Sequence, residues 1–239
     1  MEPAPNASRT HLDPSELGTK QFWDEAYARE ISNNAEDAED EGTIWFDDSG
    51  AEEKVIQYLE DLHDGPDAKI SKGEEGRGSR IVDLGTGNGH MLFELRQEEQ
   101  RHEKWKAEAE EDDGSAPPDP QTLRFERWDI LGEQAGDWLS EGFDLVLDKG
   151  TFDAISLSAE TDAQGRRVCE TYRERVLPLI KKGAFLIITS CNWTRKELLN
   201  WFETDDGQLK LFNELDYPKF TFGGRQGQSV CTLVFQKCK

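Results

Sequence analysis

The 239-residue sequence has few cysteines and no long apolar run. Its longest uninterrupted apolar stretch, Ala184 to Ile188, is far shorter than the roughly 20 residues that span a membrane. Residues 1–10 are polar and carry no apolar core of a signal peptide, so we expect no secretion. The four cysteines form no Cys-x-x-Cys pair and do not cluster with the histidines. We therefore expect no metal site and a cytoplasmic location, with the nucleus as an alternative.

Basic residues are also scarce. The chain has 28 Lys and Arg against 50 Asp and Glu, a formal net charge of -22. This charge argues against a protein that binds nucleic acid or an anionic membrane, and it favours a basic protein partner or simply high solubility. The stretches 33–53 and 97–122 carry 15 of the 22 net negative charges, and both are typical of loops or solvated helix faces.

With 35% hydrophobic and 10% aromatic residues, the sequence can still build a core of one α/β domain. We expect a disordered tail over 1–12 and an N-terminal helical cap with an acidic connector over 13–79. The core is expected over 80–239, with 97–122 as an acidic loop insertion.

The hydrophobic periodicity predicts alternating helices and strands. Expected helices are 20–31, 51–62, 165–181 (interrupted near Pro178) and 194–202; expected strands are 80–84, 123–128, 143–147, 184–189, 209–215 and 229–236. This alternation is typical of a parallel α/β sheet with helices on both faces. The last two strands have no helix between them, which predicts an antiparallel edge hairpin.

A glycine-rich loop follows the first expected strand of the core. Gly85-Thr86-Gly87-Asn88-Gly89 places backbone N–H groups and a helix N-terminus at the carboxyl edge of the sheet, where nucleotide-like ligands bind. The dinucleotide fingerprint needs its third glycine where this chain has His90, which counts against a nicotinamide-dependent oxidoreductase. The loop could also be a tight turn that needs glycine for its backbone conformation alone.

Two acidic residues follow expected strands. Asp129 comes after 123–128, and Asp148 comes after 143–147. Because parallel strands end at one edge of a sheet, we expect both acids to point at the same crevice. The alternative is that each is a helix N-cap or a solvated loop residue.

Longer strings carry more specific information than the glycine loop. They are Leu17–Asp24, Gly42–Phe46, Asp148–Leu157, Thr189–Thr194 and Pro218–Arg225. Together with Gly-x-Gly-x-Gly preceded by Asp83, they resemble a family of class I S-adenosylmethionine-dependent protein-lysine methyltransferases. This is the elongation factor methyltransferase four family, which modifies translation elongation factor 1-alpha. The resemblance runs from about Leu17 to Lys237, apart from one gap.

The resemblance implies a Rossmann-like fold, S-adenosylmethionine as cofactor and elongation factor 1-alpha as a basic protein substrate of a monomeric enzyme. It implies that Asp129 contacts the adenine amino group and that Asp148 is catalytic, orienting the incoming amine. The full set of cofactor-binding residues that it implies is Asp83, Gly85, Thr86, Gly87, Gly89, Asp129 and Ile130.

The implied reaction is attack of a neutral lysine amine on the sulfonium methyl group. Because lysine is normally protonated near pH 7, a narrow apolar channel would favour the neutral amine. Trp23, Trp45 and Trp193 are candidates to line the cofactor or lysine channel, with ordinary packing as the alternative. Asp148 is not part of an Asn/Asp-Pro-Pro-Tyr-like motif, which disfavours methylation of amino groups on nucleic-acid bases.

The gap in the resemblance covers residues 97–122. These 26 residues contain no Val, Ile, Leu, Met or Phe, so they cannot form a buried parallel strand followed by a helix. The second strand of such folds carries the acid that holds the ribose hydroxyls, and we expect that strand, its acid and the next helix to be missing. Three explanations stay open: a lost coding segment, a variant that no longer binds cofactor, or a ribose contact from one of Glu108, Glu110, Glu111, Asp112 and Asp113. The alternative function is therefore a catalytically inactive methyltransferase-like chain that acts at most as a binding protein.

Overall fold

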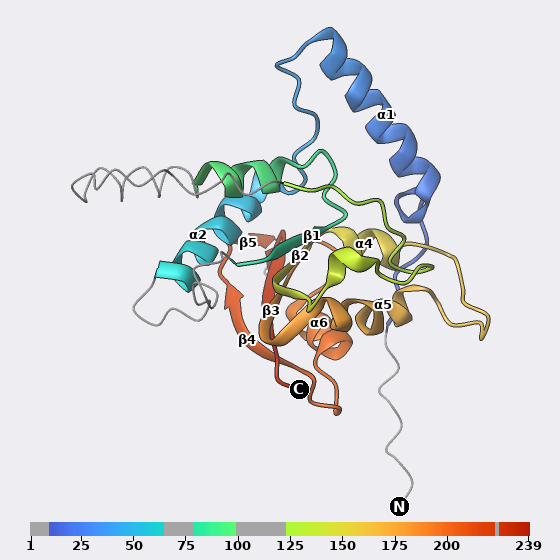
Figure 1. Ribbon diagram of the computed structural model, residues 1–239, viewed down its shortest axis with the longest axis vertical. Coiled ribbons are helices and arrows are strands. Elements are labelled where there is room, and N and C mark those ends of the chain that lie inside the picture. The colour runs from blue at the N-terminus through green and yellow to red at the C-terminus, as the bar shows by residue number, and fades with distance from the viewer. Residues whose placement is uncertain (1–9, 65–78, 99–122, 223–224) are drawn as a thin grey trace, which may run out of the picture.

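The computed structural model describes residues 10–64, 79–98, 123–222 and 225–239, and a five-stranded sheet forms its centre (Figure 1). The strand order is β1-β2-β3-β7-β4. The first three strands are parallel, β7 runs antiparallel to β3, and β4 runs antiparallel to β7. The bounds are β1 (Ile81–Leu84), β2 (Phe143–Lys149), β3 (Ile180–Ser190), β4 (Leu209–Leu215) and β7 (Cys231–Lys237). This arrangement confirms the expected α/β fold with a C-terminal antiparallel edge pair.

Successive side chains of the central strands pack on opposite faces of the sheet, as the two-residue period of a strand requires. Leu145 and Leu147 of β2 join one apolar cluster with α2 (Ala51–Asp64) and the helix that begins at residue 90. Val146, between them, joins the other cluster with α4 (Thr151–Ser156), α5 (Cys169–Val176) and α6 (Arg195–Phe202). The helices therefore cover both faces, which is why these strands are almost continuously apolar.

Most helices lie close to the sheet, whereas α1 stands away from it (Figure 1). The α-helices are α1 (Lys20–Glu36), α2 (Ala51–Asp64), α4 (Thr151–Ser156), α5 (Cys169–Val176) and α6 (Arg195–Phe202). Short 3-10 turns are η1 (Glu16–Gly18), η2 (Asp47–Ser49), η4 (Asp137–Leu139) and η5 (Leu177–Leu179). A separate hairpin pairs β5 (Lys219–Phe222) with β6 (Arg225–Gln228). No helix of the described part of the chain is long and apolar enough to cross a membrane.

The sequence patterns located most of these elements. A capping box starts α6: the Thr194 side chain accepts from the Glu197 amide, and the Glu197 carboxylate accepts from the Thr194 amide. The helix expected from residue 165 begins only at Cys169 and gives way to η5 at Pro178. Neither α4 nor the β5–β6 hairpin was expected, because both are too short to show a period.

The strand expected over 123–128 is wrong. Those residues form no strand, and the Phe125 side chain is 54% exposed. A strand needs a neighbour for its backbone hydrogen bonds, and within the described residues the only strand beside β1 is β2, on one side. Alternation of apolar and polar residues alone therefore does not make 123–128 a strand. The expected tail and acidic insertion lie almost wholly outside the described residues.

Candidate functional site

A cavity of about 410 Å³ lies at the carboxyl ends of the parallel strands. Its floor comes from the ends of β1 and β2 and the glycine-rich loop, and its cover comes from α1 and residues 43–46. The volume falls within the range of small-molecule sites, which is about 300–1,000 Å³. The position matches the crevice that open α/β sheets use for ligands.

Two glycines of the loop are required both by their backbone conformation and by side chains that lie too close for a Cβ atom. Gly85 has φ +63°, and a Cβ there would lie 2.2 Å from the Thr151 hydroxyl oxygen, which donates to the Leu84 carbonyl at 2.6 Å. Gly87 has φ +61°, and a Cβ there would lie 2.8 Å from the Tyr27 hydroxyl oxygen. Both positions therefore require glycine for conformation and for space. A turn alone would explain only the conformation.

Two polar side chains of the cavity wall interact with charged neighbours in the same wall. The Thr86 side chain lies beside the Asp83 carboxyl and lowers its pKa. Oε2 of Glu52 is buried and lies 3.6 Å from the Lys149 ammonium. All four residues line the cavity, so its floor is polar and charged.

Asp83 lies in β1, one residue before the strand ends, and lines the same cavity. Burial raises the pKa of its carboxyl to about 6; the Thr86 side chain and the Lys149 charge oppose the rise, and the Glu52 charge adds a little to it. The carboxyl is thus mostly ionised at neutral pH but easily protonated below it.

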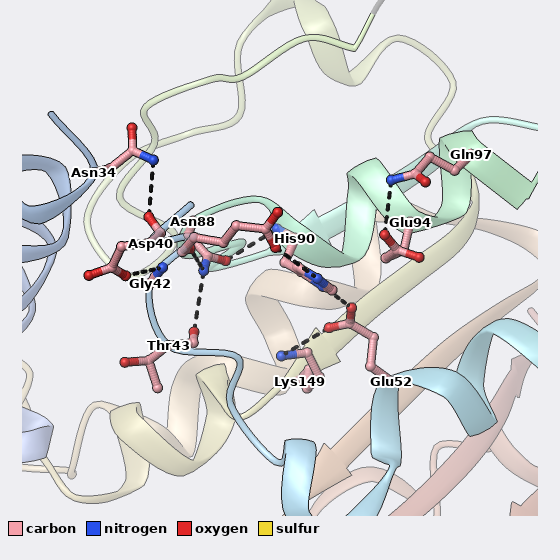
Figure 2. A network of polar contacts seen from close by, with 11 residues as sticks. Asn34, Asp40, Gly42, Thr43, Glu52, Asn88, His90, Glu94, Gln97 and Lys149 are labelled. Carbon is pink, nitrogen blue, oxygen red and sulfur yellow. Dashed lines mark hydrogen bonds and ion pairs between the residues drawn. The ribbon is translucent and has the colours of Figure 1, made fainter. Parts of the chain in front are cut away.

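Two side chains, those of Asn88 and Lys149, fasten the cover of the cavity to its floor, and Figure 2 shows the Asn88 contact. The Asn88 side-chain amide donates to the backbone carbonyls of Glu41 at 2.8 Å and Thr43 at 3.3 Å. Lys149 donates to the Trp45 carbonyl at 3.2 Å. The 41–45 segment is therefore held by the glycine loop and by the end of β2.

Glu52 of α2 connects these elements from below (Figure 2). Its side chain is buried, His90 hydrogen-bonds to its Oε1, and the Lys149 ammonium lies 3.6 Å from its Oε2. A buried carboxylate is stable only with such partners. The network ties α2, the helix from residue 90 and β2 together under the cavity.

The two hydrogen bonds from Asn88 to the cover of the cavity lead to a prediction. Asn88→Ala removes both bonds to the cover, so the 41–45 segment loses its anchor on the glycine loop. We expect the affinity for S-adenosylhomocysteine, the product form of the cofactor implied by the sequence, to fall about 5- to 20-fold. Calorimetric titration measures this. Asn200→Ala, on the exposed side of α6, is the matched control and should bind like the wild type.

The expectation that Asp148 faces the crevice is wrong. Its side chain is 1% exposed and does not line the cavity. One oxygen accepts from the Thr151 amide at 2.9 Å, and the other accepts from the Tyr172 hydroxyl at 2.6 Å. Asp148 thus satisfies the first amides of α4. It lies within β2, two residues after Val146, so the two-residue period of the strand points it to the face that Val146 and Tyr172 occupy.

The remaining implied cofactor residues divide into two groups. Asp83, Gly85, Thr86 and Gly87 all line the cavity. Gly89, Asp129 and Ile130 do not: Gly89 lies against Phe93 and Phe125, Asp129 is exposed, and Ile130 packs on the core. Since 123–128 is not part of the sheet, no strand end holds Asp129 at the crevice. Its contact with adenine stays a prediction.

The tryptophans also divide. Trp23 and Trp45 line the cavity and pack edge to face with ring centroids 5.2 Å apart. Trp193 is 3% exposed and stacks on Phe152 in the core, so it is a packing residue.

Sequence reasoning missed several residues that line or support the cavity. Tyr27, Asn88 and Glu52 carry no motif by themselves, although all three fall in or beside the strings described above. Asp153 lines the cavity from α4 and accepts from the Ser190 hydroxyl and the Cys191 amide at 2.8 Å. Burial raises the pKa of the Cys191 thiol to about 12, so this cysteine is not a nucleophile at neutral pH.

Comparison with known proteins gives relatives that match over nearly the whole chain. Protein-lysine N-methyltransferase EFM4 of Saccharomyces cerevisiae is 40% identical over 233 residues, which cover 95% of this chain and 96% of the relative. The efm4 protein of Schizosaccharomyces pombe is 38% identical, and the match covers 94% of this chain and 95% of the relative. Human EEF1A lysine methyltransferase 2 is 34% identical, and the match covers 94% of this chain and 88% of the relative.

The chain belongs to this family of protein-lysine N-methyltransferases. This confirms the family that the sequence strings and the glycine-rich loop predicted. No family model matches the chain. Among solved structures, the N-methyltransferase NodS of Bradyrhizobium japonicum WM9, in complex with S-adenosyl-L-homocysteine, covers 90% of this chain and 98% of its own, with a TM-score of 0.48 and 13% identity. The family assignment rests on the sequence relatives.

Proposed function

We propose that this chain is an S-adenosylmethionine-dependent protein-lysine N-methyltransferase that acts on translation elongation factor 1-alpha. The observation that carries the proposal is identity of 34–40% to lysine methyltransferases over at least 94% of the chain. The cavity at the sheet edge supports it, because four of the implied cofactor residues line that cavity.

The cofactor site that we propose consists of Asp83, Gly85, Thr86 and Gly87. The Thr86 side chain lies beside the Asp83 carboxyl, and both residues line the cavity. The Asp83 carboxylate offers acceptors for hydroxyl or ammonium groups. S-adenosylmethionine supplies an electrophilic methyl group on a sulfonium sulfur.

The chain's own contribution is to bind the substrate lysine and to favour its neutral form. Loss of solvent on entering the larger cavity lowers the pKa of the substrate lysine and so favours its neutral amine. Asp153, the nearest acid to the end of β3, is committed to Ser190 and Cys191 with both oxygens. We therefore propose that the lysine proton leaves to solvent rather than to a dedicated base, with alignment as the main catalytic effect.

The charge of the chain fits a basic protein substrate. A net charge of -22 speeds encounter with a basic partner and repels nucleic acid and anionic membranes. Action as a monomer in the cytoplasm, with the nucleus as alternative, remains part of the proposal.

The test uses the purified full-length chain, purified elongation factor 1-alpha and S-adenosylmethionine with a labelled methyl group. We expect label on one or more lysines, located by peptide mass spectrometry. Titration with S-adenosylhomocysteine runs in parallel. A folded chain that neither methylates nor binds would support the alternative, an inactive methyltransferase-like protein, and would overturn the proposal.

A further inference from the structure

A second, smaller cavity lies between α1 and the segment that follows it. Its volume is about 290 Å³. Phe22, Trp23, Tyr27 and Trp45 give it aromatic walls, and Glu30 supplies a carboxylate. The helix that provides most of the wall buries none of its 17 residues. Its aromatic residues therefore form cavity walls rather than core.

The two cavities share one wall. Trp23, Tyr27, Thr43 and Trp45 line both of them. Phe22 and Glu30 line only the smaller one. The smaller cavity therefore adjoins the proposed methyl-transfer site, and one protein substrate can place side chains in both.

The Glu30 carboxylate accepts a hydrogen bond with only one of its two oxygens. Its Oε1 accepts from the Thr43 amide at 3.1 Å. Its Oε2 is buried and has no hydrogen-bond partner among the described residues. Gly42, with φ +80°, leaves room for this oxygen, since a Cβ there would lie 2.7 Å from it. Buried acceptors are nearly always paired, so Oε2 of Glu30 is an acceptor that a donor group of a ligand can complete.

The surroundings of the cavity are strongly acidic. Residues 33–53, which lead from the end of α1 past the cavity to α2, contain nine acidic residues and no basic one. Glu36, Asp37 and Glu39 among them are exposed. Arg29 also lines the cavity, and its side chain is exposed. The local field therefore attracts a cation.

We infer that the smaller cavity binds a lysine or arginine side chain of the protein substrate, next to the lysine that is methylated. Aromatic faces attract a cation, and an unpaired carboxylate gives it a charge-assisted hydrogen bond. An apolar side chain would leave Glu30 unpaired, and an acidic one would be repelled by it. The inference rests on the proposed function and specifies how that function selects its substrate.

The experiment measures steady-state methylation of full-length elongation factor 1-alpha by the wild type and by Glu30→Gln. Glutamine keeps an oxygen for the Thr43 amide but removes the charge. We expect KM for the protein substrate to rise about 3- to 30-fold, with kcat within about twofold of the wild type. Affinity for S-adenosylhomocysteine should stay unchanged. Phe22→Leu, which removes one ring, should raise KM about threefold.

Glu25→Gln is the matched control. Glu25 lies on the same helix, is exposed, and accepts from the Gln21 side chain at 2.8 Å without lining either cavity. It loses the same charge, so it reports long-range steering alone. An equal rise of KM in both variants would overturn the subsite, as would unchanged KM in Glu30→Gln or a loss of cofactor affinity in that variant. An inactive wild type would instead count against the proposed function itself.

Discussion

Replacing Gly87 by arginine is expected to weaken S-adenosylhomocysteine binding about 100-fold or more. Gly87 lies in the wall of the larger cavity at φ +61°, and any Cβ there meets the Tyr27 hydroxyl oxygen at 2.8 Å. The long arginine side chain would have to displace Tyr27 or fill the space that the proposed cofactor needs. Methylation of elongation factor 1-alpha should be lost with it. Calorimetric titration and the methylation assay measure the two effects.

The chain offers a control for backbone strain. Gly165 has φ +77°, but a Cβ there would meet nothing within 4 Å. Gly165→Arg therefore carries a similar conformational cost, on the order of 1–2 kcal/mol, without entering the cavity. We expect it to bind the cofactor product normally while unfolding at a somewhat lower temperature. If both variants lose binding equally, the loss reflects strain or instability, and the glycine loop is not the cofactor site.

Replacing Asp148 by alanine is expected to lower the free energy of unfolding by about 3–5 kcal/mol. The carboxylate accepts from the amides of Thr151 and Phe152 and from the Tyr172 hydroxyl, all of which would lose a buried partner. The stacked ring pair formed by Phe152 and Tyr172 would lose its polar anchor at the same time. Urea unfolding followed by tryptophan fluorescence measures the change. Asp205→Ala, at an exposed loop position, should change stability by less than about 0.5 kcal/mol.

The same residue predicts a pH dependence. Burial raises the pKa of Asp148 to about 7 in the folded chain, above its ordinary value of 3.8. Between these values the folded state holds a proton that the unfolded state has released, so the contribution of Asp148 to stability decreases as pH rises through this window. Asp148→Asn cannot titrate. The stability advantage of the wild type over Asp148→Asn should therefore be smaller at about pH 7.5 than at about pH 5.5. An advantage that grows with pH would contradict the assigned environment.

Stability and activity together separate a structural from a catalytic role for Asp148. The structure buries its carboxylate away from the cavity. Asp148→Asn molecules that remain folded should therefore keep most of their cofactor affinity. A large loss of kcat in a stable Asp148→Asn variant would restore the catalytic role implied by the family resemblance.

The sequence by itself determined the family, the order of most elements and the position of the glycine loop. These features are local: a capping box at Thr194, an apolar run in β3 and a Gly-x-Gly-x-Gly spacing are each written within a dozen residues. The family resemblance implied Asp83 as a cofactor residue, and the structure places Asp83 in the cavity wall.

Only the tertiary structure decided which side chains face the cavity. The buried partner of Asp148 is Tyr172, which lies 24 residues away in the chain. Residues 123–128 alternate like a strand but pair with no strand among the residues that the structure describes, and pairing is a property of the sheet rather than of the segment. The aromatic cover joins Trp23, Tyr27 and Trp45 to the glycine loop across about 40 to 60 residues of sequence. Contacts between distant segments leave no periodic trace in the sequence, because burial and hydrogen bonding depend on which surfaces meet.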